Sequence, residues 1–301
     1  MLKVLNKYII SKSHKRQMID IKRNSKKEPI RALGLRTKTS SIYSPNQNTD
    51  FKISRGKFYN FLTCQRCFYL DRVKGFDVPG TPGWTLNETT DILLKKEFDY
   101  CRERQIPHRV FISNKLTNIV PFNHTDIDEW RDSLHRGLKI RYKSTNIILT
   151  GGIDDIWQDK KTKKLILVDY KSQAKTGRLD KQNYLTDPYH DSYKKQMDFY
   201  SYLFLKKGFN LDEISYFLVC NAKRDSQAFN QKLEFEEYLI PYKWNIDWIE
   251  NKLDEMISLL NNNEVPNANQ SCKNCAYSEQ YAKLLNKKIG NQIKEVQGNL
   301  F

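Results

Sequence analysis

The segment Leu165–Lys171 places four consecutive apolar residues directly before an aspartate, a tyrosine and a lysine. This pattern predicts a strand that leads from the core to a charged site. Because side chains alternate along a strand, Asp169 and Lys171 share one face and Tyr170 lies on the other. An earlier apolar segment, residues 145–157, precedes it across a short polar turn. We expect the two segments to pair as a hairpin.

Helical and strand patterns follow one another along most of the chain and predict a single α/β core. The 301 residues are enough for one large domain. We expect the core to span residues 51–280, with a polar C-terminal tail at residues 281–301. The segments predicted as helices are 58–70, 88–104, 191–207 and 248–262, and those predicted as strands are 145–157, 165–171, 214–221 and 232–240.

The predicted hairpin brings two carboxylates close to each other. If its turn is centred between Lys161 and Thr162, Asp154 lies opposite Asp169, where like charges repel each other. A divalent cation such as Mg²⁺ or Mn²⁺ removes that penalty, because hard cations prefer carboxylate oxygens. Lys171 could then orient or deprotonate a water molecule, or stabilise charge on a phosphate. The alternative is a surface hairpin that carries ordinary charges.

Three motifs follow one another in the central part of the chain: Gly151-Gly-Ile-Asp154, Val168-Asp169-Tyr-Lys171 and Gln196-Met-Asp-Phe-Tyr200. With these motifs in this order the chain resembles the PD-(D/E)XK nuclease superfamily, in its RecB-like and CRISPR-adaptation exonuclease branch. The segment 58–70 is also similar to the sequence motif at the start of proteins of that branch. The resemblance implies a restriction-endonuclease-like core, with a mixed central sheet flanked by helices and a cysteine-clamped helical periphery.

The resemblance also assigns roles to individual residues. It implies that Asp154, Asp169 and the backbone carbonyl of Tyr170 hold the metal ion, and that Lys171 assists the attacking water. Two further residues, Gln196 and Tyr200, are expected to contact the nucleic acid or to brace the site. They are four positions apart and lie on one face of a helix.

A further metal ligand is expected on the first core helix, where the branch usually carries a histidine or a glutamate. The aligned stretch Asn87–Asp91 has an aspartate at that position. Both Asp91 and Glu97 flank the apolar stripe of the helix. Asp91 fits the spacing of the family, and Glu97 is the alternative. Either residue could also be a solvated helix edge.

Two C-x-x-C pairs lie at opposite ends of the predicted core, Cys64 with Cys67 and Cys272 with Cys275. Paired thiolates at this spacing can chelate one metal centre, and two pairs complete four ligands. The resemblance favours an iron–sulfur cluster, because some RecB-like exonucleases close their fold with one. Those proteins divide the cysteines one and three, whereas this chain divides them two and two. Structural Zn²⁺ therefore remains the alternative.

The chain is strongly basic, with 51 Lys and Arg against 35 Asp and Glu and a net charge of +16. This balance favours a polyanionic partner, with DNA first and RNA not excluded, ahead of an anionic membrane surface. Residues 1–50 hold 12 basic and 3 acidic residues and predict a mostly flexible basic arm. No apolar run is long enough to span a membrane and no secretory signal is visible, so we expect a cytoplasmic protein.

These observations favour a Mg²⁺-dependent deoxyribonuclease, and in particular an exonuclease in DNA repair, recombination or defence. Two other classes of function remain open. A non-catalytic nucleic-acid-binding module on the same fold would keep the basic surface and bind no metal at the carboxylates. An interaction protein would use the cysteines to bind zinc and would need no divalent ion elsewhere.

Overall fold

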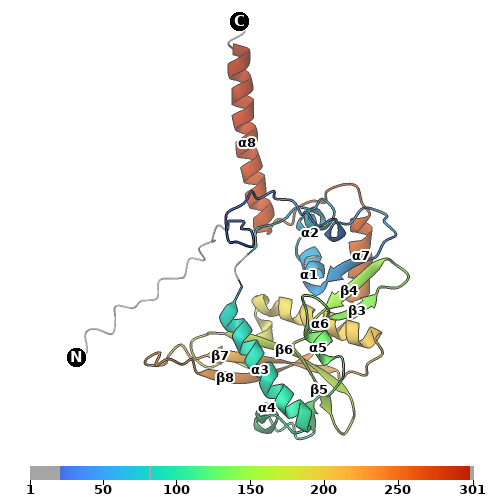
Figure 1. Ribbon diagram of the computed structural model, residues 1–301, viewed down its shortest axis with the longest axis vertical. Coiled ribbons are helices and arrows are strands. Elements are labelled where there is room, and N and C mark those ends of the chain that lie inside the picture. The colour runs from blue at the N-terminus through green and yellow to red at the C-terminus, as the bar shows by residue number, and fades with distance from the viewer. Residues whose placement is uncertain (1–20, 81–82, 299–301) are drawn as a thin grey trace, which may run out of the picture.

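The computed structural model describes residues 21–80 and 83–298, with side chains up to residue 286. The first twenty residues of the expected basic arm lie outside these ranges. Within them the strands form a five-stranded main sheet, ordered β2-β5-β6-β7-β8, and a three-stranded small sheet, ordered β1-β4-β3 (Figure 1). The strands are β1 Phe51–Ser54, β2 Ile119–Pro121, β3 Leu138–Arg141, β4 Ile147–Gly151, β5 Asp155–Asp159, β6 Leu165–Gln173, β7 Ile214–Ala222 and β8 Phe235–Lys243.

Helices cover both faces of the main sheet, as Figure 1 shows. The longest of the covering helices, α3, crosses one face, while α6 lies on the other face between the main sheet and the small sheet. Three more helices, α1, α2 and α7, pack beyond α6 and the small sheet. The helices are α1 Arg55–Thr63, α2 Gln65–Arg72, α3 Thr85–Arg104, α4 Arg109–Ser113, α5 Ile127–Arg131, α6 Asp191–Lys206, α7 Ile249–Leu260 and α8 Lys273–Gly298, with short 3₁₀ turns at Thr39–Ser41, Tyr184–Thr186 and Pro188–His190.

The main sheet is mixed, which confirms the predicted fold class. Only β6 and β7 run parallel, and α6 connects them, while the other neighbours in this sheet are antiparallel. The main sheet lies between two apolar clusters of buried residues. One contains Phe58, Phe199 and Phe217 on the α6 side, and the other contains Phe98 and Trp157 on the α3 side. No helix in the described part of the chain is long and apolar enough to cross a membrane.

The register of the β5–β6 hairpin is the one that the sequence predicts. Asp155 pairs with Val168 and Gln158 pairs with Leu165. Continued by one residue, this register places Asp154 opposite Asp169. The two carboxylates therefore enter the site from neighbouring positions of the hairpin.

The single strand expected over residues 145–157 is divided. Residues up to Gly151 belong to β4 in the small sheet, and β5 begins four residues later in the main sheet. Two glycines make this transfer possible, because a Cβ on Gly151 would lie 2.9 Å from the Tyr200 ring and one on Gly152 would lie 2.5 Å from Cβ of Ser133. The apolar pattern is continuous across the break, so periodicity alone does not show it.

The structure describes parts of both the expected arm and the expected tail. Within the expected arm, Arg36 Nε donates to Asp71 at 2.9 Å, and the buried Tyr43 donates its hydroxyl to Asn261 Oδ1 at 2.9 Å. At the other end, α8 continues to residue 298 where a polar tail was expected. It projects away from the domain (Figure 1). The packed part of the chain therefore includes residues 36–50.

Candidate active site

Asp169 lies in the central strand β6, and its side chain is fully buried. Gln196 Nε2 on α6 donates to Asp169 Oδ1 at 2.5 Å. The second oxygen, Oδ2, forms an ion pair with Lys171 Nζ but has no hydrogen-bond partner among the described residues. Burial raises the pKa of Asp169 to about 7. A buried carboxylate with an oxygen that accepts no hydrogen bond is a fitting ligand for a divalent cation, which would stabilise its charged form.

Lys171 shares the face of Asp169, as strand alternation predicts. Its ammonium lies 4.6 Å from the centre of the Tyr193 ring. Burial opposes its charge, but the Asp169 and Asp154 carboxylates raise its pKa above the ordinary value. Lys171 is therefore protonated at neutral pH. This state fits the donating role among those that the sequence leaves open, and the choice between the roles stays a prediction.

Asp154 precedes β5 by one residue. Its Oδ2 accepts the backbone N–H of Tyr170 at 2.8 Å, which ties it to the residue next to Asp169. Burial is the main cause of the raised pKa of Asp169, and the negative charge of Asp154 adds to it. The two carboxylates are thus close enough to repel each other in the absence of a cation.

The first core helix, α3, brings Asp91 toward this pair. Burial raises the pKa of Asp91, and the charge of Asp154 raises it further, while Lys95 Nζ lies 2.8 Å from its Oδ2. Glu97 instead contacts His108 at 3.0 Å and Arg109 at 2.8 Å. Asp91 rather than Glu97 therefore faces the carboxylate pair. Its role as a ligand stays a prediction.

Gln196 and Tyr200 lie on one face of α6, as their spacing predicts. Besides its bond to Asp169, Gln196 Nε2 lies 3.3 Å from the Tyr200 hydroxyl, and both side chains are buried. Both side chains therefore lie inside the fold, and whether they brace the site or contact nucleic acid stays a prediction. A further cation, Arg55 at the start of α1, was not singled out from the sequence. Burial raises the pKa of Tyr200, and the positive charge of Arg55 opposes that rise.

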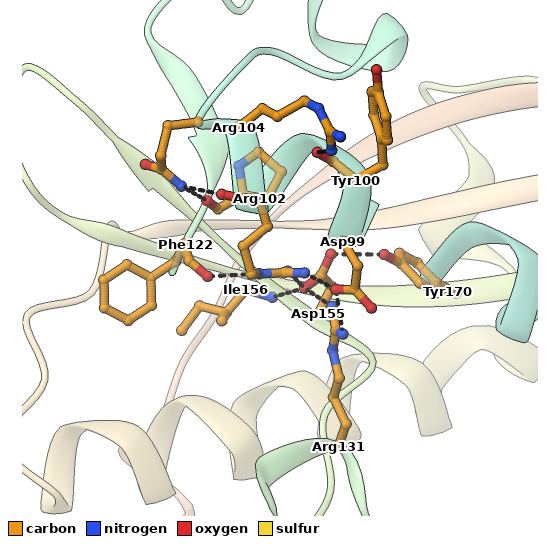
Figure 2. A network of polar contacts seen from close by, with 11 residues as sticks. Asp99, Tyr100, Arg102, Arg104, Phe122, Arg131, Asp155, Ile156 and Tyr170 are labelled. Carbon is orange, nitrogen blue, oxygen red and sulfur yellow. Dashed lines mark hydrogen bonds and ion pairs between the residues drawn. The ribbon is translucent and has the colours of Figure 1, made fainter. Parts of the chain in front are cut away.

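The opposite face of the hairpin carries a polar network centred on Asp155 (Figure 2). This carboxylate is fully buried and pairs with Arg102 from α3 and, at 2.7 Å, with Arg131 from α5. It also accepts the Tyr170 hydroxyl at 2.9 Å. The network fixes the strand ends that present Asp154 and Asp169. Its arginines are distant in sequence, so no local signal marks Asp155.

Replacing Asp155 with alanine should strongly destabilise the domain. The change leaves two nearly buried guanidinium groups without their shared buried carboxylate, and breaking such a pair costs about 3–5 kcal/mol. Urea denaturation measures the loss. Asp99→Ala is the matched control, because Asp99 contacts the same arginines but is 42% exposed. The control should lose less than about 1 kcal/mol. Equal losses would contradict the central role of Asp155.

The four cysteines of the two C-x-x-C pairs gather at one point, and they form no disulfide bonds with one another. Cys64 lies at the break between α1 and α2 and Cys67 in the first turn of α2, while Cys272 and Cys275 lie at the base of α8. Their sulfur atoms all lie within 4.8 Å of one another. Among the described His, Cys, Asp and Glu side chains, this is the one group of three or more placed to hold a metal ion. The carboxylates of Asp91, Asp154 and Asp169 do not form so close a group.

Comparison with known proteins gives one family. The model of the PD-(D/E)XK nuclease superfamily matches residues 83–280. The matched region contains Asp91, both hairpin carboxylates, Lys171 and the second cysteine pair. No curated protein matches the chain.

Proposed function

Because the chain belongs to the PD-(D/E)XK nuclease superfamily, we propose that it is a Mg²⁺- or Mn²⁺-dependent nuclease that hydrolyses phosphodiester bonds of DNA. The observation that carries the proposal is the Asp169–Lys171 ion pair, buried in the central strand beside Asp154. The net charge of +16 supports a nucleic-acid substrate. More specifically, we propose an exonuclease of the RecB-like branch. The order of the three central motifs supports this more specific proposal.

Each residue of the site has its own role in this proposal. Asp154 and Asp169 would hold the ion, with the Tyr170 carbonyl and Asp91 as further ligands. When bound, the ion supplies Lewis-acid polarisation of the phosphate and a more acidic water molecule. The protonated Lys171 donates to that water or to a phosphate oxygen. Gln196 fixes the orientation of the Asp169 carboxylate through its hydrogen bond at 2.5 Å.

A digestion panel tests the proposal. End-labelled linear single-stranded and duplex DNA, circular DNA and RNA are incubated with Mg²⁺, Mn²⁺ or a chelator. We expect metal-dependent loss of linear DNA, and sparing of circles would identify an exonuclease. Binding without cleavage of any substrate, with either ion, would favour the non-catalytic nucleic-acid-binding module and overturn the proposal.

Deleting residues 1–20 should weaken DNA binding and reduce its dependence on salt. These residues contain five Lys or Arg and one acidic residue, and each lost phosphate contact lowers the salt slope by about 0.9. The deletion ends before the packed residues 36–50, so that Tyr43 stays in the core. Binding measured across a salt series gives the slope.

The matched control for this deletion keeps the length and replaces the five basic residues with glutamine. It should reproduce the effect, because charge and not chain length is responsible. An unchanged slope in both variants would show that residues 1–20 make no phosphate contacts.

A further inference from the structure

We propose that the four cysteines bind a single tetrahedral zinc ion and not an iron–sulfur cluster. The distances between the sulfur atoms carry this inference. Cys64 Sγ lies 3.7 Å from Cys275 Sγ, and Cys67 Sγ lies 3.5 Å from Cys272 Sγ and 3.4 Å from Cys275 Sγ. All four lie within 4.8 Å of one another.

These distances match four ligands that share one ion. Zinc binds thiolate at about 2.3 Å in tetrahedral geometry, which separates the sulfurs by about 3.8 Å. The structural zinc sites of proteins are closed four-coordinate sites of this kind, and two C-x-x-C pairs supply their ligands. The chain therefore presents a ligand set of the right size without rearrangement.

An iron–sulfur cluster does not fit the same distances. In a four-iron cluster each cysteine binds a different iron at the outside of an inorganic core, so the sulfurs stand farther apart. In a two-iron cluster, if each C-x-x-C pair held one iron, the core would separate one pair from the other. Here the three short contacts all join sulfurs of different pairs. No room for a cluster core remains between the pairs.

The protein itself holds the two pairs in place. Asn269, three residues before Cys272, donates its side-chain amide to the Thr63 carbonyl next to Cys64 at 2.8 Å. Arg66 lies 2.6 Å from Glu279 of α8. Cys64 and Cys275 are 3% and 6% exposed, whereas the other two are partly exposed. These two contacts join the segments that carry the two pairs, in addition to any bond through a metal.

The test is the metal content of the full-length protein, purified without oxygen from cells supplied with both iron and zinc. We expect about one zinc per chain, no acid-labile sulfide and no brown colour. Cobalt exchanged into the site should give the visible absorption of a tetrahedral thiolate complex. Iron with acid-labile sulfide would overturn the proposal, and so would four thiols that react freely in the folded protein.

A reconstitution experiment separates the two metals further. The apoprotein is incubated anaerobically with iron and sulfide, and an equimolar amount of zinc is then added. We expect zinc to occupy the site and the iron to be released. A cluster that survives the zinc, or a single iron that zinc does not displace, would overturn the proposal. Cys101→Ser is the control, because Cys101 lies outside the cluster and its loss should leave the zinc content unchanged.

Discussion

Lys171→Ala should abolish DNA cleavage while leaving a folded protein. The substitution removes the ammonium group that pairs with Asp169 Oδ2. Groups that donate or accept a proton in the transition state contribute about 10²- to 10⁴-fold to the rate. We expect a loss of that size, measured as single-turnover cleavage of labelled DNA with Mg²⁺. Circular dichroism and a thermal transition check the fold.

Lys161→Ala is the matched control. It removes the same charge from the exposed turn of the same hairpin and should cleave DNA at the wild-type rate. Asp169→Ala should lose as much activity as Lys171→Ala, and the double variant should lose little more, because the two residues act as a unit. Undiminished cleavage by both single variants in clean preparations would refute the assignment.

Cys272→Ser should lower the free energy of unfolding of the whole domain. A metal held by both pairs joins residues at least 205 positions apart, from Cys67 with Cys272 to Cys64 with Cys275 at 211 positions. Cross-links that close a loop of that length are worth about 5 kcal/mol in the disulfide model, because they restrict the unfolded chain. Guanidinium denaturation with and without a strong chelator measures the effect. Chelation should destabilise the wild type to the level of the variant.

The control is again a buried cysteine outside the cluster. Cys101→Ser should cost about 1 kcal/mol for burying a hydroxyl, and the chelator should still destabilise it further. If the chelator had no effect on wild-type stability, the cysteines would not form a metal cross-link. Thiolates must be deprotonated to bind metal, so the difference between wild type and Cys272→Ser should shrink in acid.

Local periodicity predicts the parts of the site that lie on single elements. Strand alternation places Asp169 and Lys171 together, and the helical spacing places Gln196 beside Tyr200. The position of the turn determines the register of the hairpin, and the turn can be located in the sequence because it is short and polar. Each of these relations depends only on residues close in the sequence, and the structure shows each of them.

Relations between distant elements are not visible in the same way. Arg102 and Arg131 meet Asp155 only because α3 and α5 pack against the hairpin. The division of residues 145–157 between two sheets depends on the approach of Tyr200 to Gly151. Tyr43 is buried because it meets Asn261 from the other end of the chain. A sequence pattern cannot show such contacts, since it contains no information on which elements become neighbours.

The joining of the first and last packed elements also constrains how the protein emerges from the ribosome. Cys67 is made 205 residues before Cys272. At about 5–20 residues per second, roughly 10–40 s pass between the synthesis of these two cysteines. During that interval α1 and α2 carry the apolar surface and thiols that α7 and α8 will cover. The early helices therefore reach their final packing only after the last packed residues have been translated.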